Sequence, residues 1–212
     1  MSAWIEPLAL ENALVRLTPL LALHEQGLND AAADGELWNL GFTSVPRPEH
    51  MQAYIDHALQ QQANGLAQAF AVLEKNSGRL LGSTRYCNVD AGNRRLEIGY
   101  TWYRQSAQRS GVNTACKQLL LEHAFDRLNA SAVEFRTHWH NHRSRAAIAR
   151  LGAKQDGVLR NSFRRADGSM RDAVVFSIIL FSLIGLPPFA GFVGKLQIFY
   201  ALVQARLWTV LV

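Results

Sequence analysis

One stretch of the chain, residues 95–138, restricts the possible folds more than any other. It begins with an alternating segment, Arg95–Tyr103, that predicts a strand, and it ends with a second such segment, Ala132–His138. Between them, the polar turn Gln108–Asn113 leads into a helical pattern that ends near Leu128. A strand, a crossover helix and a second strand place the two strands parallel in one sheet. The stretch therefore predicts a sheet with at least one parallel pair.

The other segments surround this unit with antiparallel strands. Turns at Asn76-Ser77-Gly78 and Asp90–Asn93 connect three successive strands into a meander. The remaining expected elements are strands over Leu14–Pro19, Ala69–Glu74 and Arg79–Asn88, helices over Leu20–Asp30, Glu49–Asn64 and Asn141–Leu151, and a hairpin of Lys154–Arg164 with Met170–Ile179. This order predicts an α/β domain with a single mixed, mostly antiparallel twisted sheet of about six to seven strands, flanked by about four helices.

The turn Gln108–Asn113 also suggests a binding site. Gly111 can adopt a positive φ and lets a ligand approach the backbone closely. The first amides of the following helix have no partner inside the helix, and the helix dipole adds partial positive charge there. These features fit a pyrophosphate group. An ordinary helix start beside a glycine explains the same residues, so this stretch alone leaves both interpretations open.

Composition narrows the class of protein. Hydrophobic residues make up 49% of the chain and charged residues 18%, which is typical of a folded protein. Two of the 22 basic residues and none of the 17 acidic residues lie beyond Ile179, which leaves a net charge of +3 on residues 1–179. This mild excess suits an anionic ligand, but the chain lacks the dense basic block that nucleic-acid binding favours.

The two cysteines and the N-terminus bear on location. Cys87 and Cys116 provide neither a disulfide framework nor the spacing of metal ligands, and a reducing compartment is the simpler interpretation. The N-terminus has no basic run followed by an apolar stretch, so it does not predict a signal peptide. We therefore expect a cytoplasmic protein.

Five segments resemble the GNAT acetyltransferase superfamily, and more narrowly its branch that includes the ribosomal-protein N-terminal acetyltransferases. They read LLGSTRY, LEIGYTW, QRSGVNT, NHRSRAAIARLGAKQDGVLRN and DGSMRDAVVFSII. They occur in the order of the family, with the right elements between them, over residues 7–179. The resemblance implies the GNAT fold, acetyl-CoA as the acetyl donor, an amine acceptor and no metal.

The resemblance also implies which residues bind acetyl-CoA. The family's turn has the form Gln/Arg-x-x-Gly-x-Gly/Ala, and Gln108, Gly111 and Asn113 occupy these positions, although Asn113 is larger than the usual residue. Amides of the turn would bind the pyrophosphate, amides of the preceding strand would polarise the thioester carbonyl, and Asn141 would contact the pantetheine arm. The implied cofactor-binding residues are Ile98, Gly99, Tyr100, Gln108, Arg109, Ser110, Gly111, Val112, Asn113, Thr114 and Asn141.

Acetyl transfer to an amine needs a base, because an aliphatic amine is mostly protonated at neutral pH. Glu97 is the candidate, since it lies on the strand before the signature turn and family members often carry a carboxylate near this place. Strand alternation places Glu97 and Gly99 on one face. A carboxylate that only pairs with Arg85 or Arg95 is the alternative.

Ser144 is the candidate proton donor. Together with Asn141 it matches the Asn-x-x-Ser of this branch, in which the serine can lie near the sulfur of CoA. Contact with the cofactor without proton transfer is the rival role. Both residues also suit a purely structural role, because Asn141 is a good helix N-cap and Ser144 falls three positions later.

Three further residues are candidates for the substrate cleft. Trp38 and Phe42 lie in the Gly- and Pro-rich stretch 31–48, where exposed aromatic side chains can line a pocket or cover the edge of a core. His138 could line the cleft or stay exposed. The alternation of His138, His140 and His142 resembles a zinc site, but it spans a strand end and a helix start, where alternation should break.

Several arginines allow two interpretations. Arg104 and Arg109 lie where a side chain could assist the phosphates of the cofactor, or they could form a solvated basic surface. The arginines of the last hairpin could attract an acidic peptide, and we favour a solvated surface for them; they are Arg160, Arg164, Arg165 and Arg171.

Residues 180–212 differ from the rest of the chain. They contain no acidic residue, and Ala173–Gly194 contains no charge at all. The segment resembles part of subunit N of the respiratory NADH–quinone oxidoreductase, with Lys195 at a lysine of that motif, but a lone fragment carries no pumping role. Its apolar length would suffice for a membrane span, yet Pro187-Pro188 would break a lone helix. We favour a GNAT domain at 1–179 and a foreign or fused apolar appendage at 180–212.

The leading hypothesis is an acetyl-CoA-dependent N-acetyltransferase in which a primary amine attacks the thioester directly. The acceptor is a protein N-terminus or a small-molecule amine, and the protein is a monomer or a homodimer. The alternatives are a non-catalytic acyl-CoA-binding module and a membrane-associated protein that acts through its tail.

Overall fold

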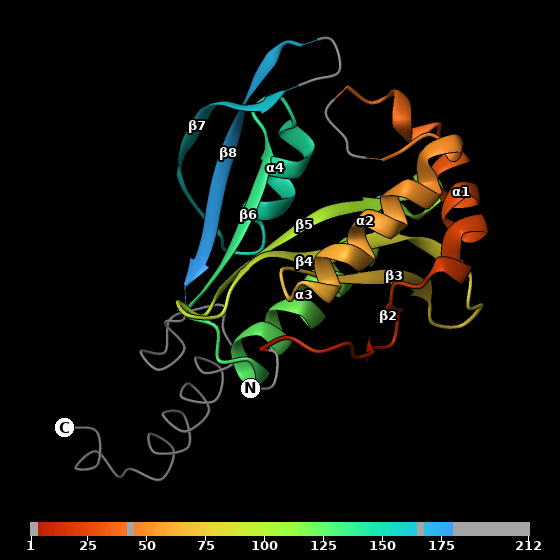
Figure 1. Ribbon diagram of the computed structural model, residues 1–212, viewed down its shortest axis with the longest axis horizontal. Helices are drawn as coiled ribbons and strands as arrows, with labels where there is room; N and C mark the ends of the chain where they lie inside the picture. Colours follow the sequence, from red (N-terminus) through yellow and green to blue (C-terminus); the bar gives the residue numbers. More distant parts are fainter. Residues whose placement is uncertain (1–3, 42–44, 165–167, 180–212) are drawn as a thin grey trace, which may run out of the picture. The chain divides into compact units, whose positions relative to one another are not determined.

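The computed structural model describes residues 4–41, 45–164 and 168–179. Within these residues the backbone forms a single sheet of eight strands with the order β1-β2-β3-β4-β5-β6-β8-β7 (Figure 1). The expected apolar appendage at 180–212 lies outside the described residues, as does Phe42. None of the helices in the described residues is long and apolar enough to cross a membrane.

The strands confirm the predicted α/β fold. They are β1 (Leu10–Glu11), β2 (Val15–Pro19), β3 (Gln68–Glu74), β4 (Leu80–Asp90), β5 (Arg95–Tyr103), β6 (Ala132–His138), β7 (Lys154–Arg164) and β8 (Met170–Ile179). The first five pair antiparallel in sequence order, and β7 pairs antiparallel with β8. The addition to the predicted set is β1, whose two residues are too few to produce a periodic pattern.

The crossover predicted from residues 95–138 is present. Strands β5 and β6 are parallel, with Arg95 opposite Ala132 and Glu97 opposite Glu134. The helical region between them runs from Val112 to Arg127, close to the predicted end near Leu128, although its α-helical part ends at Glu122 and a single π-helical turn, His123–Arg127, completes it.

Four α-helices flank the sheet, as predicted. They are α1 (Glu25–Ala33), α2 (Met51–Ala63), α3 (Val112–Glu122) and α4 (His142–Ala149). Short 3₁₀ turns extend the helical regions at Ala22–His24, Leu37–Asn39, Pro48–His50 and Gln105–Ala107. The expected loop at 31–48 therefore starts later than predicted, because α1 continues to Ala33.

Helices α2 and α3 cover opposite faces of the sheet. Successive strand residues point to opposite faces, and the neighbours Thr84 and Arg85 of β4 contact different helices. The Arg85 guanidinium lies over the ring of Tyr54 from α2, whereas the Thr84 hydroxyl lies near the Lys117 amine from α3. Each face thus contributes its own set of side chains to anything that binds at the level of β4 and β5.

The main apolar core lies between α1, α2 and the sheet. Leu28, Ile55 and Met51 are fully buried there, next to Trp102 of β5. Burying a side chain of this kind stabilises the fold by about 1.5–3 kcal/mol. Because Trp102 belongs to the same strand as Glu97, this core holds the candidate site's strand in position.

Candidate active site

The sheet splits between β5 and β6. The two strands pair only at their beginnings, where Arg95, Leu96 and Glu97 face Ala132, Val133 and Glu134. From Ile98 onward, β5 pairs with no strand on that side within the described residues, and Figure 1 shows the two strands diverging. An unpaired strand edge of this kind can accept an extended molecule whose amide groups continue the sheet.

A bulge in β5 accompanies the split. Ser83 pairs with Trp102 and Arg85 with Gly99, so the two residues Tyr100 and Thr101 lie opposite the single residue Thr84. Tyr100 has a φ of 50°, which places it in the left-handed region. A bulge bends its strand and redirects the backbone groups beside it. The backbone segment Ile98–Tyr100, predicted to polarise a thioester carbonyl, therefore lies at the point where the sheet opens.

The predicted phosphate turn precedes α3. Gly111 has a φ of 87° and caps the helix, and Arg109 has a φ of 63°. A Cβ built on Gly111 would meet nothing nearer than the Leu14 Cδ1 atom at 3.9 Å, so the conformation and not the space requires glycine. Asn113 lies in the first helical turn, which shows that the turn keeps its form without a small residue at this position.

Side chains hold the turn in place. Gln108 donates from Nε2 to the Tyr103 carbonyl at 3.1 Å, and the Ser110 hydroxyl donates to the Ala107 carbonyl at 2.5 Å. Both bonds run toward the preceding segment and leave the helix start itself unoccupied by these side chains. The amides of Val112, Asn113 and Thr114 open the helix and have no carbonyl one turn earlier to bind. The arrangement fits an anion at the start of α3.

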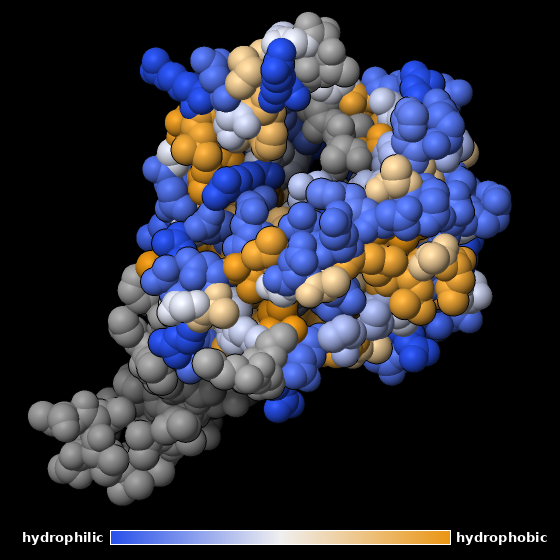
Figure 2. All heavy atoms as spheres, viewed as in Figure 1, coloured by the Kyte–Doolittle hydropathy of each residue, from blue (hydrophilic) through white to orange (hydrophobic). Residues whose placement is uncertain are grey.

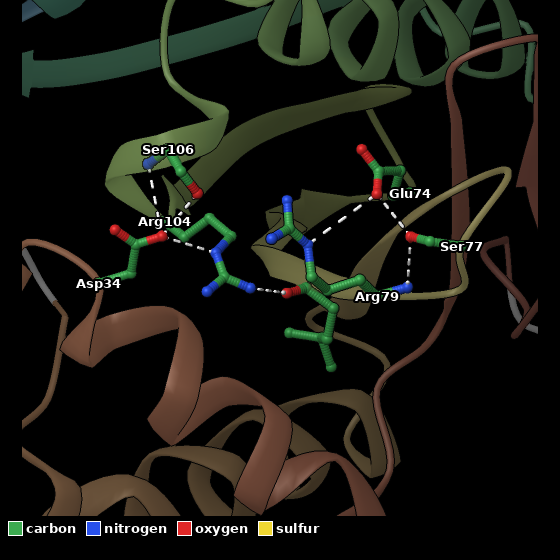
Figure 3. A network of polar contacts seen from close by, with 7 residues as sticks. Asp34, Glu74, Ser77, Arg79, Arg104 and Ser106 are labelled. Atoms are coloured by element: carbon green, nitrogen blue, oxygen red, sulfur yellow. Dashed lines mark hydrogen bonds and ion pairs between the residues drawn. The ribbon is translucent and has the colours of Figure 1, made fainter.

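Arg104 is paired with an acidic residue before the turn. Its Nε atom lies 2.7 Å from Oδ2 of Asp34, and the same oxygen accepts from the Ser106 hydroxyl at 2.6 Å (Figure 3). The hydrogen bonds from Ser106 and Arg104 hold the pKa of Asp34 below its usual value. Arg104 thus connects the segment before the turn to the end of α1, and the suggestion that it assists the phosphates stays a prediction.

Glu97 is buried at the start of the split. Its Oε2 atom accepts from Nδ2 of Asn88 at 2.8 Å and lies 3.2 Å from Nε of Arg136. Burial raises its pKa above the ordinary value, although Asn88 and Arg136 oppose the shift. The expected alternative partners are wrong, because Arg95 pairs with Glu134, and Arg85 contacts tyrosine rings.

Glycine at position 99 makes room for this carboxylate. A Cβ built on Gly99 would lie 3.1 Å from Oε1 of Glu97 and 3.0 Å from Sγ of Cys87. Glu97 and Gly99 therefore share one face of β5, as predicted, and the carboxylate leans along the strand toward the bulge. That face also carries the Arg85 side chain and α2.

Lys117 approaches the bulge from the opposite face of the sheet and was not among the residues predicted for the site. Its side chain is buried, with Nζ 2.6 Å from the Thr101 hydroxyl and 5.8 Å from the centre of the Phe135 ring. Burial lowers its pKa to about 8. Lys117 lies three positions before the apolar residue Leu120, a spacing that places both on one side of the helix, and this was the only hint of its burial in the sequence. Lysine more often covers a helix surface with its charged end in water, so the spacing alone did not predict a buried side chain.

A hollow lies on the α2 side of β4 and β5. Its lining residues come from α2, from the segment before β3, from β4 and from the bulge, and they are His57, Gln61, Leu66, Ala67, Arg85, Cys87, Asn88 and Tyr100. Figure 2 also shows a depression of the surface between the part that carries α1 and α2 and the part that carries α4, β7 and β8, whereas the residues that line the hollow beside Arg85 come from the first part and from β4 and β5. Burial raises the pKa of the Cys87 thiol to about 12, so this lining cysteine stays protonated.

Asn141 and Ser144 lie across the split from β5, where α4 follows β6. The Asn141 side chain accepts from the Ser144 amide at 3.1 Å and caps the helix. This confirms the cap. Within the part of the chain that the structure describes, no hydrogen bond joins Ser144 to Glu97, and their catalytic roles stay predictions.

The remaining predicted substrate residues lie apart. Trp38 packs against the core between α1 and α2 and is not among the residues that line the hollow. His138 ends β6, and its Nδ1 atom accepts from the His140 amide at 3.1 Å. No group of three or more His, Cys, Asp or Glu side chains suited to a metal ion occurs among the described residues.

The sequence matches the Acetyltransferase (GNAT) domain family over residues 15–154. It is 27% identical over 173 residues to the uncharacterised N-acetyltransferase p20 of Bacillus licheniformis, covering 76% of this chain and 94% of that protein. It is 31% identical over 102 residues to YdaF of Bacillus subtilis (strain 168), a candidate ribosomal N-acetyltransferase, covering 48% and 55%. A crystal structure of a candidate acetyltransferase from T. thermophilus is similar, with a TM-score of 0.72, 31% identity, and coverage of 83% and 91%.

A separate match covers the end of the chain. Residues 171–212 match the family of membrane proteins described as NADH:quinone oxidoreductase/Mrp antiporter. Over 32 residues the chain is 69% identical to subunit N of the NADH-quinone oxidoreductase of Anaeromyxobacter sp. (strain Fw109-5), which is 15% of this chain and 6% of that protein. The predicted similarity of the tail is confirmed, and the match covers a small fragment of the membrane protein.

Proposed function

Because the chain belongs to the GNAT acetyltransferase family, we propose that it transfers the acetyl group of acetyl-CoA to a primary amine by direct attack within a ternary complex. One observation carries the proposal: the split between β5 and β6 and the glycine-capped start of α3 occur in the same unit. The split suits an extended pantetheine arm, and the helix start suits its pyrophosphate.

The backbone at the bulge would stabilise the developing oxyanion. In the proposed arrangement the thioester carbonyl lies beside Ile98, Gly99 and Tyr100, where amides that point away from β4 meet no strand in the part of the chain that the structure describes. Such donors act strongly when they are held in place before the reaction starts. The contacts among Thr84, Thr101 and Lys117 on the α3 face of the sheet would stabilise the bulge, and the bulge would keep these amides in place.

Glu97 would accept the proton of the incoming amine, directly or through water. The carboxylate leans toward the bulge, and its raised pKa moves its basicity closer to neutral pH, where a general base is more effective. Ser144, at the start of α4 on the other side of the split, would protonate the leaving thiolate of CoA. Asn141 would contact the pantetheine arm while it caps α4.

Direct attack is favoured over a covalent acetyl-cysteine intermediate. A cysteine attacks a thioester as its thiolate. Burial raises the pKa of Cys87 to about 12 and that of Cys116 to about 11, so both stay protonated near neutral pH. The amine itself is therefore the better nucleophile in this site.

The acceptor would be a protein N-terminus or a small-molecule amine. The similarity to a candidate ribosomal N-acetyltransferase favours the former, whereas the hollow beside Arg85 suits either. Residues 1–179 would act as the catalytic domain in the cytoplasm, as a monomer or a homodimer, and residues 180–212 would be an appended segment of foreign origin.

The test is thermal unfolding of the full chain with and without acetyl-CoA, followed by transfer assays on a panel of amines. At 100 times its dissociation constant, a ligand stabilises the native state by roughly 2.7 kcal/mol. We expect a clear rise in Tm together with release of CoA that depends on an amine. A rise without transfer to any amine would favour the non-catalytic acyl-CoA-binding module, and no rise in a folded protein would overturn both.

A further inference from the structure

The most unusual side chain outside the predicted catalytic set is Arg85. It lies in the middle of β4, and only 1% of its surface is exposed. Its guanidinium lies 4.0 Å from the centre of the Tyr100 ring and 4.8 Å from that of the Tyr54 ring. An arginine remains charged in proteins, so the fold holds a buried cation at the wall of the hollow.

The tyrosine rings do not satisfy the hydrogen-bonding capacity of this cation. Cation–π contacts use the faces of the guanidinium, whereas its N–H groups point outward within its plane. The Nε and Nη2 atoms of Arg85 are buried and have no hydrogen-bond partner among the described residues. Burying a charge without hydrogen-bond partners is costly, and folds rarely retain one unless something else compensates it.

The neighbouring acidic groups do not fill this role. Glu97 is bound to Asn88 and Arg136, and the Cys87 thiol stays protonated. Nε and Nη2 are also the two nitrogens on one edge of the guanidinium, and their N–H groups point in the same direction. This edge matches the two oxygens of a carboxylate, which arginine binds through two parallel hydrogen bonds.

The position of Arg85 connects it to the reaction. Arg85 is the cross-strand partner of Gly99, next to the bulge where we place the thioester carbonyl. The hollow that Arg85 lines has a volume of about 290 Å³, at the lower limit for small-molecule sites. A group bound there would be compact and would lie close to the reacting amine.

We propose that Arg85 binds a carboxylate of the acceptor, so that the preferred substrates are amines that carry a carboxylate near the amino group. This rests on the proposed acetyl transfer and specifies its acceptor. The carboxylate belongs either to a free amino acid or to an acidic side chain close to the N-terminus of a peptide, and the chemistry at Arg85 is the same in both.

The test uses matched acceptors that differ only in the carboxylate. L-alanine is compared with L-alaninamide, and the peptide amide Ala-Asp with Ala-Asn, using the full chain and saturating acetyl-CoA. We expect kcat/KM to be at least tenfold higher for the acid in one of the two pairs, which also identifies the source of the carboxylate. Equal values within both pairs would overturn the proposal while leaving acetyl transfer intact.

Arg85→Lys tests the residue itself. The variant keeps a positive charge but loses the two parallel N–H groups on the edge of the guanidinium. Its kcat/KM should therefore fall at least tenfold for the acid and change little for the matched amide. The matched control is Arg79→Lys, an exposed arginine just before β4 that should leave both values unchanged. Equal losses for acid and amide in Arg85→Lys would overturn the proposal, because they would indicate a structural role.

A binding measurement separates failure of the proposal from failure of the enzyme activity. N-acetyl-L-alanine and its amide resemble the products and need no turnover. Suppose that no amine is acetylated. If N-acetyl-L-alanine still raises the Tm of the wild type more than its amide does, and this difference is smaller for Arg85→Lys, the carboxylate site stands without the activity. Should the lysine variant fail to fold, the wild-type comparison of acid with amide decides the proposal alone.

Discussion

The two faces of the sheet at the split between β5 and β6 differ in what forms the candidate site: backbone groups on one face and side chains on the other. Toward α3, the candidate cofactor site consists mainly of backbone: the glycine-capped turn, the first helix amides and the bulge at Tyr100. Toward α2, the candidate acceptor site consists of side chains, with Arg85, Cys87 and Tyr100 around one hollow. A backbone site tolerates side-chain changes such as Asn113, whereas a site of side chains can change its preference through single substitutions.

The largest effect on the acceptor side is expected at Glu97. In Glu97→Gln the base is lost, and kcat should fall by about 10²–10⁴-fold, the usual contribution of general acid–base catalysis. Acetyl-CoA affinity should stay unchanged, because the carboxylate is absent from the cofactor side. Steady-state kinetics and calorimetric titration measure the two quantities.

The pH–rate profile sharpens this prediction. Glu97 acts only when ionised, and burial raises its pKa, so the wild-type rate should fall as pH drops through that raised value. The variant should lack this acid limb. Glu134→Gln is the matched control, since Glu134 faces Glu97 across the parallel pair and binds Arg95 and Arg136. A profile that is the same in wild type and Glu97→Gln would exclude Glu97 as the base.

Lys117 contacts the bulge from the α3 face of the sheet, and its substitution should change the free energy of unfolding. Its pKa is about 8 in the folded protein and near 10.5 when unfolded, so the unfolded chain binds more protons between these values. The free energy of unfolding therefore rises with pH in this window, by on the order of 3 kcal/mol. Below pH 8 the buried charge destabilises the fold by this amount.

Lys117→Met removes the titrating group and should be more stable than the wild type at pH 7, with the difference shrinking toward pH 10. Thr84 and Thr101 keep their mutual hydrogen bond of 2.7 Å in this variant. Chemical denaturation at several pH values measures the effect. A constant difference across the window would show that Lys117 does not titrate there, and the exposed Lys75→Met serves as the control.

A substitution at Gly111 tests whether the cofactor side depends on backbone conformation. Gly111→Val forces a β-branched residue toward a φ of 87°, which costs about 1–3 kcal/mol, so acetyl-CoA affinity should fall by roughly 10–100-fold. Gly78→Val is a matched control, because Gly78 has a φ of 69° and open space around it but lies in the hairpin turn between β3 and β4 and not in the turn before α3. It should lose similar stability and keep its acetyl-CoA affinity. Unchanged affinity in Gly111→Val would remove the turn from the cofactor site.

The smallest effect is expected at Asn141. Asn141→Ala removes the cap of α4 and should lower the free energy of unfolding by about 1 kcal/mol. Asn141→Ser keeps a capping oxygen, so its stability should be close to that of the wild type. If Asn141 also contacts the pantetheine arm, both variants should bind acetyl-CoA less tightly. If Asn141→Ser binds acetyl-CoA with wild-type affinity, the role of Asn141 is limited to capping α4.

Local patterns in the sequence determined most of the elements. The bounds of β5, β6, β7 and β8 are those predicted, because alternating side chains and turn residues mark both ends of each strand. The resemblance of five segments indicated the GNAT fold, and the comparisons confirm the family. The turn before α3 was also visible, since a glycine with a positive φ acts through its own backbone and needs no distant partner.

Only the tertiary structure decided which side chains meet. Arg85 was predicted only as a possible partner of Glu97 and Lys117 was not predicted to take part in the site, yet Arg85 contacts the rings of Tyr54 and Tyr100 and Lys117 contacts Thr101 in the bulge. The predicted partners of Glu97 were wrong because its neighbours depend on the parallel register with β6, which brings Arg136 close. Side-chain alternation specifies the face of a residue, but its partners follow from register, bulges and packing between segments far apart in the chain.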